Sequence, residues 1–136
     1  MKKIAFFVLA AAFVFSGCGK DDAKTTTCDL NPGNFAGSYK ITSELANGVE
    51  MHNTTYYDPC ELDDLLIFNT NGTYNYSDAG TVCSPSGDDS GVWSLVGTNL
   101  IVDSTGIGAV SDFSCTGFKY TLQDSTDTFI LTFVRQ

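Results

Sequence analysis

Residues 60–83 read CELDDLLIFNTNGTYNYSDAGTVC, which is the pattern of a β-hairpin. Two runs rich in β-forming residues, 65–68 and 73–76, flank Asn71-Gly72. This dipeptide is the strongest short-range signal for a two-residue hairpin turn. The sequence therefore predicts a hairpin centred on Asn71 and Gly72.

A two-residue turn at this place fixes the pairing of the two strands. It sets Ile67 opposite Tyr76, and it brings Cys60 level with Cys83 at the base of the hairpin. Two cysteines so placed predict a disulfide, worth roughly 3.5 kcal/mol in the chain-entropy model. We expect this bond even though Pro59 and Gly80 favour splaying of the strands near the base.

The first residues have the pattern of a signal peptide. Lys2 and Lys3 precede an apolar run, residues 4–15, which is too short to span a bilayer. The end of the run and the three residues after it, Phe15-Ser16-Gly17-Cys18, resemble a bacterial lipobox. That resemblance implies removal of residues 1–17 and lipidation of Cys18, which would anchor the chain in a membrane. The alternative is an ordinary signal peptide cut near Gly17.

Residues 18–34 are predicted to be an acylated, flexible tether, with order beginning near Cys28 or Phe35. Gly19-Lys20-Asp21-Asp22 resembles the export signal of some Gram-negative lipoproteins, which implies an outer-membrane location and surface exposure. Such a tether would leave residues 35–136 as a single domain.

Four cysteines remain once Cys18 is set aside, and an even number in an oxidising compartment indicates two disulfides. If Cys60 pairs with Cys83, Cys28 pairs with Cys115. The alternative is a zinc site, but the chain has no Cys-Xaa-Xaa-Cys pair and one histidine, so no metal is expected.

The charge of the chain limits its partners. The formal net charge is −9, and loss of Lys2 and Lys3 with the leader changes it to −11. A strongly acidic surface argues against nucleic acid, because phosphate neutralisation dominates that affinity. It also argues against docking of the domain on anionic lipid headgroups.

Alternation of apolar and polar residues predicts an all-β domain. In the first strand Tyr39, Ile41 and Leu45 share one face, while Glu44 lies on the other. Residues 84–90 and 103–109 are predicted to be loops. The predicted strands, eight in number, are 37–45, 49–57, 65–68, 73–76, 91–95, 100–102, 118–122 and 129–133.

Strands that follow one another through turns form an antiparallel meander, which closes into a barrel, a flattened barrel or two packed sheets. Closure is favoured because it removes unpaired edges. The positions expected to face inward are largely aromatic. They are Tyr39, Ile41, Trp93, Leu95, Tyr120, Leu122, Phe129, Leu131 and Phe133.

The chain from Phe35 to Arg135 resembles the lipocalin-like lipoproteins of Gram-negative bacteria, which are short calycin-type barrels. The motifs that carry this resemblance are Gly37-Ser38-Tyr39, Cys60-Glu61-Leu62-Asp63-Asp64 before Ile67-Phe68, Asn71-Gly72-Thr73-Tyr74, Cys83, Gly91-Val92-Trp93 and Leu131-Thr132-Phe133. Tyr39 stands where the family usually has tryptophan.

The resemblance also implies a role for Arg135. In lipocalins an arginine near the end of the last strand covers the aromatic residue of the first motif and closes the barrel floor. Arg135 over Tyr39 would be the counterpart, a cation–π contact of about 0.5 to 1 kcal/mol if partly exposed. The alternative is that Arg135 only makes the C-terminus soluble.

No catalytic pattern stands out in the sequence. His52 is the single histidine, no Gly-Xaa-Ser-Xaa-Gly motif accompanies it, and a solvated strand residue is expected. Carboxylates are numerous but are expected in turns and on polar faces. A calcium site at one rim lacks EF-hand spacing, so it is not expected; its ligands would be Asp58, Glu61, Asp63, Asp64, Asp88 and Asp89.

These observations favour a non-enzymatic, outer-membrane-anchored lipoprotein that binds or shields a small hydrophobic or amphipathic ligand, with no cofactor. The candidate ligand-binding residues are Tyr39, Ile41, Trp93, Tyr120, Phe129, Leu131 and Phe133. The alternative is a surface adhesin or an accessory subunit of an outer-membrane complex, with a filled core. An apolar cavity larger than about 300 Å³ favours the first hypothesis, and a filled interior with an exposed apolar patch favours the second.

Overall fold

A computed structural model describes residues 28–136. The predicted signal peptide (residues 1–17), the lipidation site Cys18 and the tether up to residue 27 lie outside the described residues. Within residues 28–136, no helix combines the length and the apolar character needed to cross a membrane.

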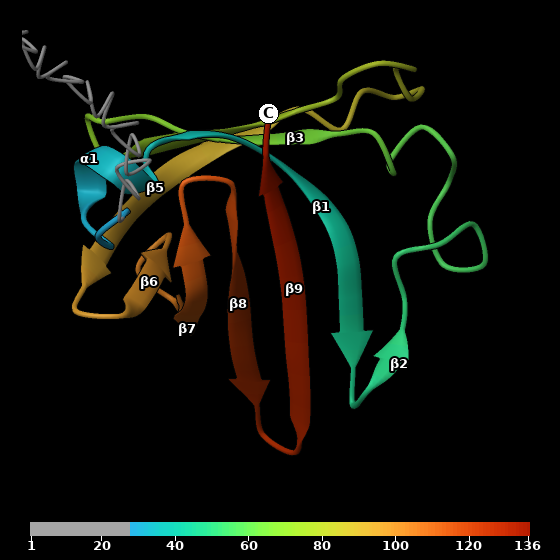
Figure 1. Cartoon of the computed structure of the whole chain (residues 1–136). Helices are drawn as coiled ribbons and strands as arrows, with labels where there is room; N and C mark the ends of the chain where they lie inside the picture. Colours follow the sequence, from blue (N-terminus) through green and yellow to red (C-terminus); the bar gives the residue numbers. More distant parts are fainter. Residues whose placement is uncertain (1–27) are drawn as a thin grey trace, which may run out of the picture.

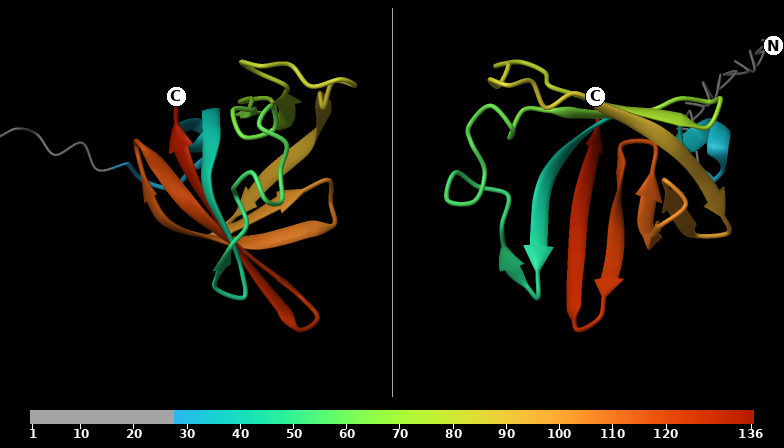
Figure 2. Two further views of the ribbon diagram at one scale, coloured as in Figure 1. Left: turned by 90° about the vertical axis from the view of Figure 1, so that its right-hand side faces the viewer. Right: turned by 180° about the vertical axis from the view of Figure 1, so that it is seen from behind.

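The described chain forms a closed antiparallel barrel of eight strands, as predicted, with one short extra strand (Figures 1 and 2). Sequential strands are neighbours, except that β2 lies outside the barrel and β1 pairs with β3. Pairing of β1 with β9 closes the sheet and leaves these two barrel strands without free edges. The elements are α1 (Pro32–Phe35), β1 (Gly37–Ala46), β2 (Val49–Glu50), β3 (Leu65–Phe68), β4 (Thr73–Ser77), β5 (Asp89–Val96), β6 (Asn99–Val102), β7 (Gly106–Ser114), β8 (Gly117–Asp124) and β9 (Asp127–Arg135).

The sequence predictions are wrong for two segments: one predicted strand is nearly absent, and the strand β7 was not predicted. The strand predicted over 49–57 is reduced to β2, and turns follow it. Residues 103–109 were expected to be a loop, but β7 begins at Gly106. Gly108 lies within this strand. Glycine is needed at this position because a Cβ atom there would collide with the ring of Tyr120 on β8. Glycine in this strand therefore makes room for a core aromatic residue instead of breaking the sheet.

The central hairpin forms, but its predicted register is wrong by one residue. Phe68 lies opposite Tyr74, and Leu66 lies opposite Tyr76. The connection has three residues, because Asn69 pairs with Thr73 through its N–H group. Gly72 has φ 84°, which matches a type I turn followed by a left-handed residue. This register puts Phe68 and Tyr74 together on the buried face, which the two-residue turn would not do.

A β-bulge interrupts the alternation of β1. The pairing with β9 runs regularly to Ile41 opposite Phe133, and then resumes with Ser43 opposite Thr132, so that Thr42 is the extra residue. After the bulge Glu44 lies opposite Leu131. Directly opposite residues share a face of the sheet, so Glu44, not Leu45, faces the interior. A bulge of this kind re-aims the side chains that follow it.

One end of the barrel is filled by aromatic side chains. Phe35 is fully buried and sits at the centre of this cluster, where its ring centroid lies 4.7 Å from that of Phe118 and 5.3 Å from that of Trp93. The core also contains Tyr39, Phe68, Tyr74, Leu100, Val110, Tyr120 and Phe133. Aromatic packing of this density fills the interior of the barrel at the closed end.

The segment 28–34 is folded, as expected if order begins near Cys28, so the predicted tether does not extend to residue 34. Asn31 caps α1 by accepting a hydrogen bond from the Asn34 N–H group (2.9 Å), and Pro32 occupies the first helical turn. Leu30 packs against the core. The predicted Cys28–Cys115 disulfide is confirmed, with 5.3 Å between the Cα atoms, and it joins this segment to the β7–β8 turn.

Arg135 closes the same end of the barrel. Its guanidinium group lies over the Tyr39 ring, with the central carbon 5.0 Å from the centroid. It donates hydrogen bonds to the Tyr39 hydroxyl (2.6 Å) and to the carbonyl of Ala36 (3.1 Å), and it also contacts the carbonyl of Asn34. This placement agrees with the role that the family resemblance implies.

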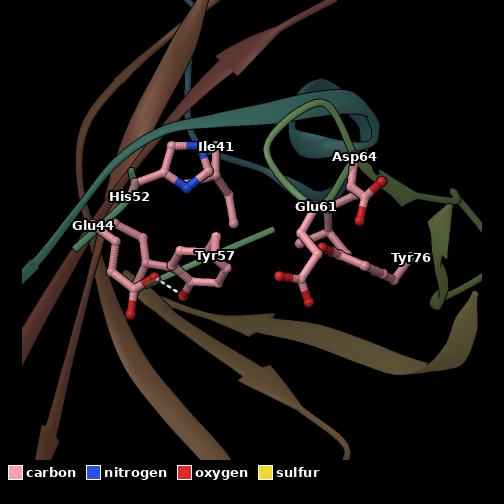
Figure 3. Close-up of a pocket in the computed structure, with 9 residues that line it drawn as sticks. Ile41, Glu44, His52, Tyr57, Glu61, Asp64 and Tyr76 are labelled. Atoms are coloured by element: carbon pink, nitrogen blue, oxygen red, sulfur yellow. Dashed lines mark hydrogen bonds between the residues drawn. The ribbon is translucent and has the colours of Figure 1, made fainter. Parts of the chain in front are cut away.

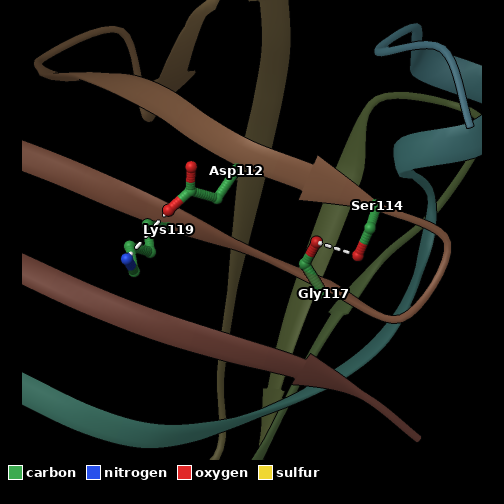
Figure 4. Close-up of polar contacts among 4 residues, drawn as sticks. All are labelled: Asp112, Ser114, Gly117 and Lys119. Carbon is green, nitrogen blue, oxygen red and sulfur yellow. Dashed lines mark hydrogen bonds and ion pairs between the residues drawn. The ribbon is translucent and has the colours of Figure 1, made fainter.

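The β7–β8 hairpin carries two kinds of polar contact (Figure 4). On the outer face Lys119 forms an ion pair with Asp112 at 2.8 Å. At the turn the Ser114 hydroxyl donates a hydrogen bond to the Gly117 carbonyl at 3.1 Å. The turn held by the second contact is the one to which Cys115 ties the N-terminal segment.

Candidate functional site

A pocket of about 310 Å³ lies at the open end of the barrel, away from the aromatic cluster around Phe35. Strands β1, β3, β4 and β9 form one side of the pocket, and the segment 51–64, between β2 and β3, forms the other. The lining residues, shown in Figure 3, are Ile41, Glu44, His52, Tyr57, Glu61, Asp64, Leu66, Tyr76 and Leu131.

The floor of the pocket is aliphatic. Ile41, Leu66 and Leu131 come from β1, β3 and β9, and each packs against the aromatic core. Their side chains face inward because each follows the alternation set by a buried neighbour, such as Phe68 after Leu66. A ligand would therefore meet an apolar surface at the bottom of the pocket.

Glu44 and Tyr57 form a hydrogen-bonded pair on the pocket wall (Figure 3). The Tyr57 hydroxyl donates to the Glu44 carboxylate. Burial, together with this hydrogen bond and the charge of Glu44, raises the pKa of Tyr57 to about 12. The phenol therefore stays protonated at neutral pH and remains a donor to the carboxylate.

Asp64 and Tyr76 form a second acidic and phenolic pair. Asp64 is 7% exposed and accepts a hydrogen bond from the Ala79 N–H group at 3.1 Å. Burial, followed by the effects of the Asp64 carboxylate, raises the pKa of Tyr76. Asp64 immediately precedes β3 and lies two residues before Leu66. Its side chain therefore points to the same, inner side of the sheet as that of Leu66.

His52 lies in the turn region after β2 and lines the pocket, which corrects its predicted place on a solvated strand. Its ring centroid is 5.7 Å from that of Tyr57. Glu50 holds this bend by accepting hydrogen bonds from the N–H groups of His52 (2.9 Å) and Glu44 (3.1 Å). Hydrogen bonds, first of all that from the Ser43 hydroxyl, lower the pKa of Glu50.

The pocket segment is tied to the loop 78–88. The Cys60–Cys83 disulfide is confirmed, with 5.4 Å between the Cα atoms. Both cysteines lie beyond the strand ends at Leu65 and Ser77, so the bond joins two loops instead of continuing the hairpin ladder. This covalent link fixes the outer wall of the pocket to the loop between β4 and β5.

Carboxylates near this link bind backbone groups. Asp63 accepts a hydrogen bond from the Thr81 N–H group at 3.0 Å, and Asp78 accepts one from Gly87 at 3.0 Å. Among residues 28–136, no three histidine, cysteine, aspartate or glutamate side chains are grouped so that they could hold a metal ion. The calcium ligand set considered from the sequence is therefore not assembled here.

The predicted ligand-binding residues separate into three groups. Ile41 and Leu131 line the pocket. Phe129 is half-buried and lines a separate depression near the β8–β9 turn. The remaining four belong to the packed core: Tyr39, Trp93, Tyr120 and Phe133.

Sequence reasoning missed most of the pocket. Glu44 was assigned to the outer face, because nothing in the alternation reveals the bulge at Thr42. Leu66 and Tyr76 were missed because the hairpin register was wrong by one residue. Asp64 lies four residues before the apolar Phe68, which places both side chains on the same face of an extended chain. This spacing could have indicated that Asp64 faces the interior. No pattern in residues 51–64 predicts which side chains of that irregular segment face the barrel.

Comparison with protein families places this geometry in a known group. Residues 35–133 match the model of the lipocalin-like domain family. The chain belongs to that family. The match covers the whole barrel except the last residues of β9, and it excludes α1 before Phe35. No curated protein and no solved structure matches the chain.

As a lipocalin-like domain, the chain has a closed floor and one accessible end. The closed end of the barrel is sealed by Phe35, Tyr39 and Arg135, whereas the pocket opens between the barrel and the segment 51–64. Pockets at the mouths of β-barrels, with an apolar surface and a few polar groups, are typical ligand sites. The geometry of this lipocalin-like domain is therefore consistent with ligand binding.

Proposed function

We propose that this lipocalin-like domain binds a small hydrophobic or amphipathic ligand at the open end of the barrel, without catalysis. The observation that carries the proposal is the pocket of about 310 Å³ with its aliphatic floor. This volume is at the lower end of the range of small-molecule sites. The pocket is of mixed polarity, so an amphipathic ligand suits it better than a hydrocarbon.

The composition of the lining supports binding without catalysis. None of the lining residues is serine, threonine or cysteine, so the lining offers His52 no aliphatic hydroxyl or thiol to activate as a nucleophile. The raised pKa of Tyr57, about 12, makes this phenol a poor base at neutral pH. Its chemistry is suited to hydrogen bonding.

A fluorescent probe tests the binding site. The uncharged dye N-phenyl-1-naphthylamine is titrated into the full chain carrying Cys18→Ala, which keeps acyl chains out of the measurement. Leu131→Trp should fill the pocket floor and abolish the rise in fluorescence. Ile107→Trp, at a position 57% exposed on the outer face, is the matched control and should bind normally. Equal binding by both folded variants would contradict the proposal.

We also propose that Cys18 is lipidated and anchors the domain in the outer membrane. The support is the sequence Phe15-Ser16-Gly17-Cys18 after a short apolar run. Mass spectrometry of the protein from its own host should show a chain that begins at Cys18 and carries acyl mass. Cys18→Ala should abolish both the acyl mass and the outer-membrane location. An unmodified Cys18 in the mature protein would refute the anchor.

The alternative, an adhesin or accessory subunit, is favoured by one observation. Val92, Val96 and Ile107 are 52%, 62% and 57% exposed on the outer face of β5 and β7. A photo-crosslinking amino acid at position 107 should then give one discrete product in the host envelope, lost on Val96→Asp. The absence of such a product would leave ligand binding as the function.

A further inference from the structure

The pocket has an unusual distribution of charge for a site with an apolar floor. Three of its lining side chains, Glu44, Glu61 and Asp64, are carboxylic acids. Glu44 faces the interior because of the bulge at Thr42, and it lies opposite the aliphatic Leu131. Carboxylates are normally kept in water, so their presence around an aliphatic floor requires an explanation.

No lysine or arginine among residues 28–136 neutralises these carboxylates. Lys119 pairs with Asp112 on the outer face, and Arg135 is held at the closed end by Tyr39. Lys40 lies opposite Val134, which is on the outer face of β9. His52 is therefore the one basic side chain in the lining of the pocket.

Aromatic rings and carboxylates face the same space. Figure 3 shows the Glu61 carboxylate projecting toward the region between Tyr57 and Tyr76. One Glu61 oxygen accepts a hydrogen bond from the Asp58 N–H group at 2.7 Å, which fixes the direction of the side chain. Tyrosine faces attract ammonium groups through the ring quadrupole. The polar wall is thus complementary to a positive charge, and the floor to an alkyl group.

We propose that the ligand of this pocket is an amphipathic cation, an alkyl amine whose ammonium group lies among Glu44, Glu61 and Asp64 and whose apolar part rests on Ile41, Leu66 and Leu131. This inference rests on the proposed ligand-binding function and specifies its ligand. A fatty-acid carboxylate of the same length is disfavoured, because like charges in a partly desolvated site repel.

Three probes with the same ten-carbon chain and different head groups test the proposal: decylamine, 1-decanol and decanoate. Each competes with N-phenyl-1-naphthylamine for the full chain carrying Cys18→Ala at neutral pH and low salt. Decylamine should displace the dye at a concentration about tenfold lower than decanoate, with 1-decanol between them. Added salt should weaken decylamine more than 1-decanol, because screening acts on the charge.

Variants that remove a single carboxylate test which residues cause the preference for decylamine. Glu44→Gln and Glu61→Gln should each weaken the binding of decylamine by about three- to tenfold and leave the affinity for 1-decanol unchanged. Glutamine at position 44 can still accept the Tyr57 hydrogen bond, so the wall keeps its shape. Asp29→Asn is the matched control, because it removes the same charge from an exposed residue near the closed end, and it should change neither affinity.

The outcomes separate the inference from the function on which it rests. Decanoate binding as tightly as decylamine would overturn the inference and leave the ligand-binding function standing. Equal weakening by Asp29→Asn and Glu44→Gln would assign the preference to net charge and would also overturn it. Failure of all three probes to displace the dye, together with normal dye binding by Leu131→Trp, would overturn both.

Discussion

The guanidinium carbon of Arg135 lies 5.0 Å from the ring centroid of Tyr39, and the two residues also share a hydrogen bond of 2.6 Å. They are opposite each other in the β9–β1 pairing that closes the barrel. Burial raises the pKa of Tyr39, with the Arg135 charge acting in the opposite direction. The pair therefore joins the first and last strands at the sealed end.

Arg135→Met should lower the free energy of unfolding by about 2 kcal/mol, because it leaves the Tyr39 hydroxyl and the Ala36 carbonyl without a charged donor. Urea unfolding followed by tryptophan fluorescence measures the change. Lys119→Met is the control, since it breaks an exposed ion pair and should cost less than about 0.5 kcal/mol. Equal effects of the two variants would mean that Arg135 does no more than solubilise the C-terminus.

Removal of each disulfide in turn should have different effects on the stability of the fold and on the affinity for the dye. Cys28–Cys115 closes the longer loop, with a sequence separation of 87 against 23 for Cys60–Cys83. Replacing each pair by serine should therefore cost about 4.6 and about 3.5 kcal/mol respectively in the chain-entropy model. Dye affinity should fall more in the Cys60/Cys83 variant, because that bond holds the pocket segment 51–64. The reverse order for binding would contradict the assigned site.

Gly108→Ala should destabilise the barrel by about 2 kcal/mol, because the new methyl group would collide with the Tyr120 ring and would lie 2.7 Å from the Thr121 carbonyl oxygen. Thermal unfolding measures the change. The control is Gly33→Ala in α1, where the nearest atom would be 3.4 Å away; stability there should change by less than about 0.5 kcal/mol. A neutral Gly108→Ala would show that β7 and β8 are less tightly packed than the structure indicates.

The sequence was informative wherever regular alternation continued without interruption. The all-β class, the meander, both disulfides and the burial of Tyr39, Trp93, Tyr120 and Phe133 follow from residue type and spacing. Periodicity gives the correct face in such stretches because successive side chains point to opposite sides of a strand.

The pocket was not predictable for three physical reasons. The bulge at Thr42 inverts the faces of β1, and an extra residue in a strand leaves no mark on its composition. A three-residue turn at Thr70–Gly72 shifts the hairpin by one, although Asn71-Gly72 is equally compatible with the shorter turn. The segment 51–64 has no repeating pattern, and its position depends on the Cys60–Cys83 bond.

The Glu44–Tyr57 pair predicts a dependence of stability on alkaline pH. Burial and the Glu44 hydrogen bond raise the pKa of Tyr57 from 10.0 to about 12. The folded state therefore holds the phenol proton more tightly than the unfolded state. Its contribution to stability is fully present below pH 10 and is lost as the pH rises to about 12.

Tyr57→Phe isolates this contribution, because phenylalanine keeps the ring and has no proton to lose. The difference in the free energy of unfolding between the original protein and Tyr57→Phe should be constant between pH 7 and 9. It should then decline between pH 10 and 12, because only the original protein loses the stabilising proton. Urea unfolding at each pH measures it, with ultraviolet absorbance of phenolate as an independent readout. A constant difference across the whole range would show that the Tyr57 hydroxyl is not held by Glu44 within the pocket wall.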